Sequence, residues 1–213
     1  MKKVLVFLMM AIMACSMLLT GCGAKTEEAP WQTAYRETGK YLQEQDALSA
    51  GSVGGEWAVI GLSRAGLLSD ETAQSYEQTV EDYVKQAGSV RLHHAKSTEN
   101  SRAILGLTAA GYNAANMAGV DLTAGLTDMA YLRAQGTNGP IWALIALDCH
   151  GYDIPQCADG EEQTTCEGLV AEILSYQCSD GGWALMGDES DVDMTAMALT
   201  SLAPYQEETD IKA

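Results

Sequence analysis

The sequence predicts an all-α protein built from about four helical hairpins. Four apolar segments with one shared pattern recur along the chain, and charge-bearing amphipathic segments lie between them. The alternation of polar and apolar residues that is typical of β-strands is not sustained anywhere. We therefore expect inner apolar helices to alternate with outer amphipathic helices.

The four apolar segments predict the inner helices. They read W-A-V-I-G-L-S-R-A-G-L from Trp57, R-A-I-L-G-L-T-A-A-G-Y from Arg102, W-A-L-I-A-L-D-C-H-G-Y from Trp142 and T-A-M-A-L-T-S-L-A-P-Y from Thr195. Their starts lie 45, 40 and 53 residues apart, which is typical of a helical-hairpin array. Each segment is apolar almost all round, as a helix buried on several sides would be. Gly66, Gly111 and Gly151 are expected to end the first three helices in the left-handed conformation.

The outer helices are expected approximately at residues 31–47, 70–86, 122–134 and 165–176. The second is the clearest, because Ser69 is a preferred N-cap and Asp70 and Glu71 complement the positive end of a helix. Tyr76 and Val80 then recur at helical spacing.

The N-terminus predicts export and membrane attachment. Lys2 and Lys3 precede an uncharged apolar run, residues 4–19, which is typical of a signal peptide and shorter than the roughly 20 residues of a membrane-spanning helix. The run ends in L-T-G-C, which resembles the lipobox of bacterial lipoproteins and implies that Cys22 is lipidated; an ordinary cleavage site or an uncleaved anchor is the alternative. We expect a signal peptide at 1–21, a tether at 22–30, repeats at 31–213, and an extracytoplasmic protein anchored to the bacterial cell membrane.

Charge and cysteine content narrow the possible partners. Residues 1–21 contain two lysines and no acid, so removing them changes the net charge from −17 to −19. Such a chain repels nucleic acid and anionic lipid. Four cysteines, Cys149, Cys157, Cys166 and Cys178, permit disulfides, with Cys157 and Cys166 the favoured pair because they flank an acidic loop. No C-x2-C spacing occurs, so neither a metal site nor a cofactor is predicted.

The joints between outer and inner helices carry a family resemblance. They read Q-C-S-D-G-G-W, Q-G-T-N-G-P-I-W and, without a nearby Gln, G-G-E-W. These motifs resemble the Gln–Trp repeats of the terpene cyclase and protein prenyltransferase superfamily, the squalene-cyclase-like α/α toroid. The resemblance implies a partial α/α toroid over residues 31–213. It also implies that the following residues tie the hairpins together: Gln135, Trp142, Gln177, Gly182, Trp183 and Trp57.

One further stretch, D-V-D-M-T-A at residues 191–196, resembles the acid motif D-x-D-D-T-A of cyclases in that superfamily. The resemblance implies that Asp193, with Asp191 beside it, is a general acid. However, Met194 replaces the third acidic residue, and closely spaced carboxyl groups help to hold a shared proton. The residues themselves favour Asp193 as an N-cap and Asp191 as an acid near the positive end of a helix.

Three functions are compatible with these patterns. The first, which we favour, is a ligand-binding or surface interaction module without catalysis, holding a small apolar or vitamin-like ligand or a protein partner. The second is an isoprenoid cyclase that uses Asp193. The third is a structural segment of a larger cell-surface protein. Because four hairpins do not close a toroid of six, we expect an apolar C-terminal edge that is covered by a partner or by further chain.

Overall fold

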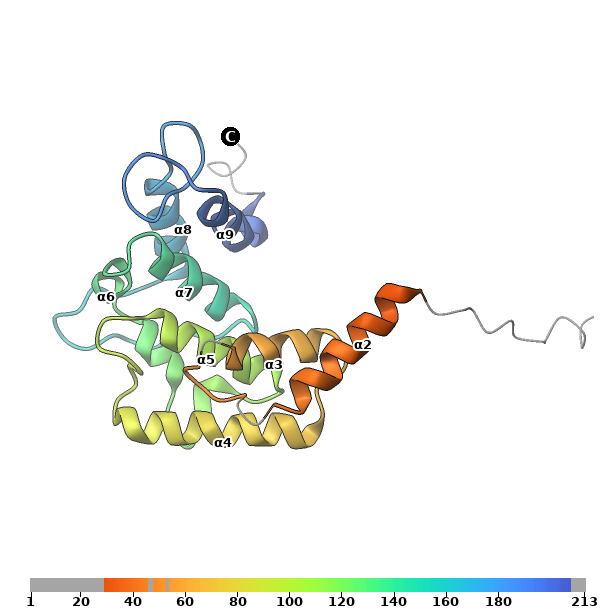
Figure 1. Ribbon diagram of the computed structural model, residues 1–213. Helices are drawn as coiled ribbons and strands as arrows, with labels where there is room; N and C mark the ends of the chain where they lie inside the picture. Colours follow the sequence, from red (N-terminus) through yellow and green to blue (C-terminus); the bar gives the residue numbers. More distant parts are fainter. Residues whose placement is uncertain (1–28, 46–47, 53, 208–213) are drawn as a thin grey trace, which may run out of the picture. The chain divides into compact units, whose positions relative to one another are not determined.

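The computed structural model describes residues 29–45, 48–52 and 54–207, and the predicted all-α class is confirmed (Figure 1). The α-helices are α2 (Pro30–Gln43), α3 (Gly55–Arg64), α4 (Asp70–Ala87), α5 (Thr98–Ala109), α6 (Met129–Arg133), α7 (Asn138–Asp148), α8 (Cys166–Ser175) and α9 (Val192–Leu202). Three short 3-10 helices are η1 (Ala114–Asn116), η2 (Leu122–Leu126) and η3 (Ala203–Tyr205). Pairing between extended segments in the described ranges is confined to isolated bridges.

The chain divides into two compact units, residues 1–38 and 39–213. Of the first unit, the structure describes residues 29–38, which include the first part of α2. The predicted signal peptide and Cys22 lie outside the described residues. The second unit contains all the remaining helices.

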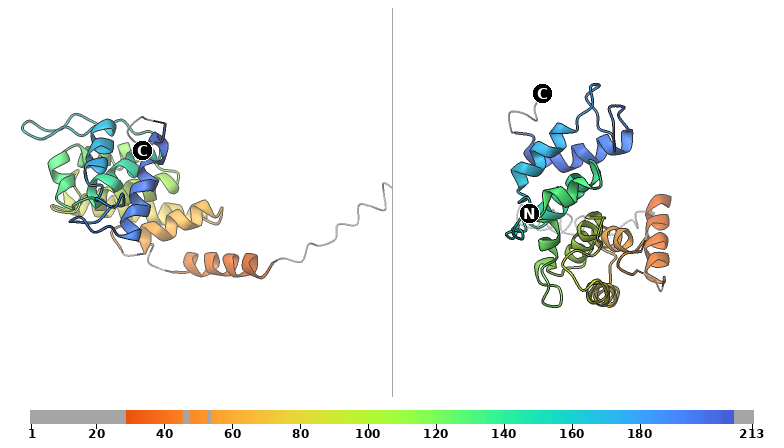
Figure 2. Two further views of the ribbon diagram at one scale, coloured as in Figure 1. Left: turned by 90° about the horizontal axis from the view of Figure 1, so that it is seen from above. Right: turned by 90° about the vertical axis from the view of Figure 1, so that its left-hand side faces the viewer.

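The four predicted apolar segments form α3, α5, α7 and α9, each beginning two to four residues before the expected start. They pack in chain order, α3 on α5, α5 on α7 and α7 on α9. Figure 2 shows α8 and α9 beyond α7 at the C-terminal end of this series. Leucine and isoleucine side chains fill the centre, where Ile104, Leu107, Ile141 and Leu144 are fully buried. Burial of these side chains is the main source of stability.

Glycines end the first three inner helices as predicted. Gly66, Gly111 and Gly151 have φ angles of 67°, 88° and 64°. A side chain would strain the backbone in this left-handed region, whereas glycine adopts it freely. In the fourth segment Pro204 occupies the corresponding position, and the chain continues from α9 into η3.

The expectations for the outer helices are confirmed for α4 and α8 but wrong for residues 122–134. The Ser69 hydroxyl accepts a hydrogen bond from the Thr72 N–H, so α4 begins as expected. Residues 122–134 instead form two short pieces, η2 and α6. The break has a local cause: the Asp128 side chain accepts from the Ala130 N–H and starts a new helix, with its own backbone extended.

The buried Asn100 amide holds the loop before α5 against η2. Its Oδ1 accepts from the Leu92 N–H at 2.9 Å, and its Nδ2 donates to the carbonyl oxygens of Val90 at 2.6 Å and Leu122 at 3.0 Å. Gly125 lies directly against this amide, where a Cβ would collide with it. One side chain therefore satisfies three backbone groups in two separate segments.

The disulfide favoured by the sequence, Cys157 with Cys166, does not form, and all four cysteines of the described chain are free thiols. The two thiols face different partners. The Cys157 Sγ donates to the Glu161 carbonyl within its own loop, whereas Cys166 lies beside the Tyr205 hydroxyl after α9. A stretch of sequence that loops between two cysteines does not by itself direct their side chains toward each other.

Candidate functional site

The N-terminal ends of α3, α5 and α7 meet around a hollow of about 510 Å³, which we call the helix-start pocket. It is lined by Gly51, Trp57, Lys96, Thr98, Glu99, Arg102, Gln135, Asn138 and Trp142. The lining combines indole rings, amides, a hydroxyl and both signs of charge. This mixture of apolar surface with a few convergent polar groups is typical of small-molecule sites.

Two tryptophans from different hairpins form the apolar side of the pocket. The rings of Trp57 and Trp142 lie edge to face, with centroids 5.2 Å apart and planes at 61°. Trp57 is 42% exposed, and Trp142 is half-buried. An edge-to-face pair fixes the ring orientations while leaving indole surface open to a ligand. Both residues were predicted as repeat ties, and the structure brings them together.

Charged residues form the polar side of the pocket. The Arg102 guanidinium lies 2.6 Å from a Glu99 carboxylate oxygen and 3.9 Å from Oε2 of Glu56. Glu56 is 1% exposed, and its Oε1 accepts from the Gly51 N–H at 2.6 Å. Arg102 is therefore held between two carboxylates from two helices, and its position is fixed before any ligand arrives.

Two tyrosines border this charged group. The Tyr83 hydroxyl donates to Glu99 at 3.4 Å, and burial, together with the nearby Glu99 carboxylate, raises the pKa of Tyr83. Burial raises the pKa of Tyr76 far above its usual value, with a further contribution from Glu56. Both phenols therefore stay protonated at neutral pH, and neither is a general base.

Gln135 joins the third hairpin to the start of α5. Its Oε1 accepts from the Thr98 N–H at 3.0 Å and the Ser97 hydroxyl at 3.1 Å, while its Nε2 donates to the Thr98 hydroxyl at 3.1 Å. The amide thus satisfies a backbone group that the helix itself leaves unpaired. This is the kind of tie between hairpins that the sequence motif implies.

Replacing Gln135 with alanine is expected to lower the free energy of unfolding by about 1–2 kcal/mol, because a half-buried helix cap is lost. Urea unfolding followed by circular dichroism would measure the change. Gln78→Ala is the matched control, since Gln78 is exposed and its amide donates to the Glu81 side chain on the same helix, and a loss below about 0.5 kcal/mol is expected. Equal losses in the two variants would contradict a capping role for Gln135.

The last motif, at residues 177–183, has a structural role. The Trp183 side chain is 3% exposed, and its indole N–H donates to the Ile173 carbonyl at the end of α8 at 2.7 Å. Gln177 donates to the Gly181 carbonyl at 2.8 Å and closes the turn. Gly182 packs closely on Ser190, where a side chain would not fit. Trp183 therefore joins α8 to the chain before α9, in contrast to the exposed Trp57.

The two aspartates at the start of α9 exchange their expected roles. Asp191 is the N-cap and accepts from the Met194 N–H at 2.8 Å, so the expectation that Asp193 is the cap is wrong. The Asp191 N–H donates to the Trp183 carbonyl, which holds Asp191 in the extended conformation that an N-cap requires. Asp193 lies in the first turn with an exposed side chain. It is thus on the surface, where water solvates its carboxylate.

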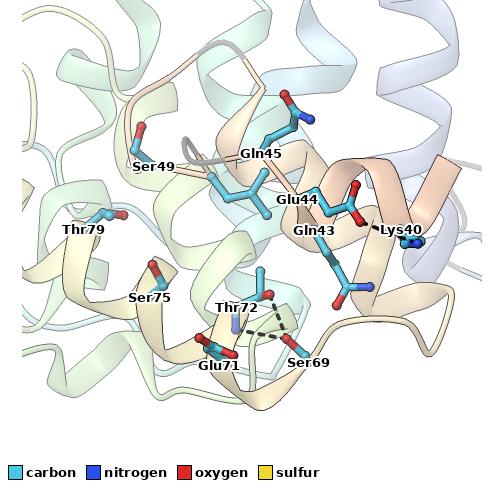
Figure 3. A pocket seen from close by; sticks show the side chains of 11 residues that line it. Lys40, Gln43, Glu44, Gln45, Ser49, Ser69, Glu71, Thr72, Ser75 and Thr79 are labelled. Carbon is cyan, nitrogen blue, oxygen red and sulfur yellow. Dashed lines mark hydrogen bonds and ion pairs between the residues drawn. The ribbon is translucent and has the colours of Figure 1, made fainter. Parts of the chain in front are cut away.

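Two further hollows lie elsewhere on the second unit. A groove of about 520 Å³ runs between the end of α2 and the start of α4, and Figure 3 shows its mainly polar lining, with Lys40 beside Glu44. Another, of about 410 Å³, lies at the C-terminal ends of α3 and α5 and includes Cys149. Desolvation by the surrounding side chains raises the pKa of the Cys149 thiol, which lowers the fraction present as thiolate at neutral pH. Neither hollow contains an accessible aromatic pair.

Comparison of the chain with protein-family models, with curated proteins and with solved structures finds no match. Within the part of the chain that the structure describes, no three His, Cys, Asp or Glu side chains are grouped so as to hold a metal ion. None of the described helices is both long enough and apolar enough to span a membrane. What the helix-start pocket can bind is therefore inferred from the positions of its own side chains.

Sequence reasoning found the tryptophans and Gln135 but missed the charged group of Glu56, Glu99 and Arg102. A signal was present, because Arg102 stands at the first position of an inner segment, where two other segments have tryptophan. A cation at an otherwise aromatic repeat position suggests that this position faces a polar site.

Proposed function

We propose that this protein is an extracytoplasmic lipoprotein, tethered through Cys22, whose helical domain binds a small molecule in the helix-start pocket without catalysing a reaction. The tether is supported by the L-T-G-C sequence at residues 19–22. The binding function rests on one observation, the accessible edge-to-face pair of Trp57 and Trp142 beside the fixed Arg102. Such an arrangement orders its binding groups before a ligand arrives, which lowers the entropy cost of binding.

The lining indicates the chemistry of the ligand. Indole surface favours a ligand with a flat or apolar face, which would lie against Trp57. Amide, hydroxyl and guanidinium groups around the opposite side favour hydrogen-bond acceptors on the ligand edge. A vitamin-like or prenyl-bearing molecule with a polar end has both features.

The arrangement of the helices is consistent with the partial toroid that the motif resemblance implies. The inner helices pack in the order α3, α5, α7, α9, and the long amphipathic α4 comes between α3 and α5 along the chain, as expected of a hairpin array. The tie from Gln135 to Thr98 supports the same proposal.

The exposed position of Asp193 favours binding over cyclisation. Protonating an alkene requires an acid kept protonated in a site without water, and enclosure is the usual means. Asp193 is exposed, and Asp191 is occupied as a helix cap.

Titration calorimetry of the purified chain against cobalamins, isoprenoids and common metabolites tests the proposal. Trp57→Ala is expected to weaken binding of the ligand at least about tenfold, which corresponds to about 1.4 kcal/mol. Trp57 is 42% exposed, so the variant should fold normally. Trp31→Ala is the matched control, because Trp31 is 68% exposed and does not line the pocket, and it should bind like the wild type.

Two results would contradict this function. One is the absence of binding across the whole panel. The other is a ligand whose affinity is the same for the wild type and Trp57→Ala.

A further inference from the structure

The last inner helix, α9, has a second apolar face that is exposed. Val192, Ala196, Leu199 and Ala203 follow one another at helical spacing, and all four are exposed. Val192 is 86% exposed and Leu199 is 57% exposed. We call these four residues the α9 outer stripe. The buried residues Met194, Ala198 and Leu202 lie on another side of the helix.

In the sequence alignment of the repeats, two of the four stripe positions are buried in the two central inner helices. Ala103 of α5 and Ala143 of α7, which correspond to Ala196, are 1% and 0% exposed. Gly106 and Ala146 correspond to Leu199 and are also buried. Gly106 faces Tyr76 of helix α4, so a helix covers this position in the second hairpin. The α9 outer stripe is an apolar helix face that the described chain leaves uncovered.

Charge around the stripe selects the kind of partner. Residues 134–207 contain thirteen aspartates and glutamates and no lysine or arginine. Arg133, which precedes this range, pairs with Glu162 and Glu172, and Arg91 pairs with Glu161. Around the start of α9, Glu189, Asp191 and Asp193 are all exposed. The N-terminal end of the stripe is therefore bordered by negative charge that these arginines do not pair with.

A second copy of the chain does not suit this surface. Two copies joined through the stripe would bring together two chains that each have a net charge of −17. Like charges across an interface oppose association, whereas opposite charges favour it and speed encounter.

We infer that the α9 outer stripe is a docking surface for a basic amphipathic helix of a partner protein. The partner places an apolar ridge along Val192, Ala196, Leu199 and Ala203, and its flanking lysines or arginines face Glu189 and Asp193. From residue 192 to 203 the stripe is about 16 Å long, which matches about three turns of a partner helix. This surface is separate from the helix-start pocket, so the inference does not depend on the proposed ligand.

Two synthetic peptides of about 18 residues provide the test. One has a leucine stripe flanked by lysines, and the other has the same stripe flanked by glutamates. Fluorescence anisotropy with the purified chain should detect binding of the lysine peptide, with at least about tenfold weaker binding of the glutamate peptide. The double variant Val192→Gln, Leu199→Gln should weaken the lysine peptide about tenfold or more. Val90→Gln is the control, since Val90 is 38% exposed and lies outside α9. This variant should bind the lysine peptide with the same affinity as the wild type.

Four results would overturn the inference. They are no binding of the lysine peptide, equal binding of the two peptides, equal affinity of the double variant and the wild type, and a dimer in sedimentation that Leu199→Gln dissociates. The last would assign the stripe to a second copy of the chain.

Discussion

Replacing Trp183 with alanine is expected to lower the free energy of unfolding by about 3–5 kcal/mol, the range found for large-to-small changes at buried aromatic residues. The indole is 3% exposed and packs within the main core. The substitution also leaves the Ile173 carbonyl, at the end of α8, without the indole N–H that it accepts from at 2.7 Å. Cavity formation and the lost hydrogen bond act in the same direction.

Urea unfolding followed by circular dichroism would measure this loss, and Trp183→Phe would separate its two causes. Phenylalanine keeps much of the ring but cannot donate to Ile173, so an intermediate loss is expected. Trp57→Ala is the control for removing an indole. Because Trp57 is 42% exposed, its replacement should lower the free energy of unfolding much less. A loss below about 1 kcal/mol for Trp183→Ala would show that this residue does not hold α8 and α9 together.

Replacing Asn100 with alanine is expected to cost about 3 kcal/mol, because three backbone groups lose their buried partner at once. The amide bonds to Leu92, Val90 and Leu122, which lie in two segments that contain no long helix. Without it, the loop before α5 and the start of η2 have to find other partners or admit water. The effect should therefore include faster hydrogen exchange at the Leu92 amide.

Asn113→Ala is the matched control for Asn100. Asn113 is exposed and bonds to one backbone group, the Ala115 N–H, at 3.0 Å, so its loss should stay below about 1 kcal/mol. Denaturant midpoints of the two variants give the comparison. If Asn100→Ala were no more destabilising than Asn113→Ala, the buried amide would not be the link between the two segments.

The sequence predicted those parts of the fold that depend on local pattern. The inner helices follow from segments that are apolar nearly all round, and Gly66, Gly111 and Gly151 end the first three because glycine readily adopts a left-handed backbone. Two wrong expectations, the cap at Asp193 and the disulfide, depended on contacts beyond the local pattern, whereas the break in residues 122–134 follows from the local cap at Asp128. Asp191 and Asp193 are equally good caps by residue type, and the hydrogen bond from Asp191 to the Trp183 carbonyl decides between them. Thiols that are close in sequence likewise face different partners.

The candidate site could be predicted only in part. Trp57 and Trp142 stood out as motif residues, but they are 85 positions apart in the sequence, and their contact depends on how the hairpins pack. The buried Glu56 gave no sequence signal, because a glutamate in the first turn of a helix is ordinarily a solvated residue that favours the helix dipole. Its role beside Arg102 depends on the packing of α3 against α5.

Nuclear magnetic resonance of the four indole N–H groups tests the central claim, that the helix-start pocket is the ligand site. On titration with a ligand found by calorimetry, the signals of Trp57 and Trp142 should shift together, while those of the buried Trp183 and of Trp31, which does not line the pocket, stay in place. Shifts confined to Trp183 or Trp31, or no indole shift at saturating ligand, would contradict the assignment of the pocket.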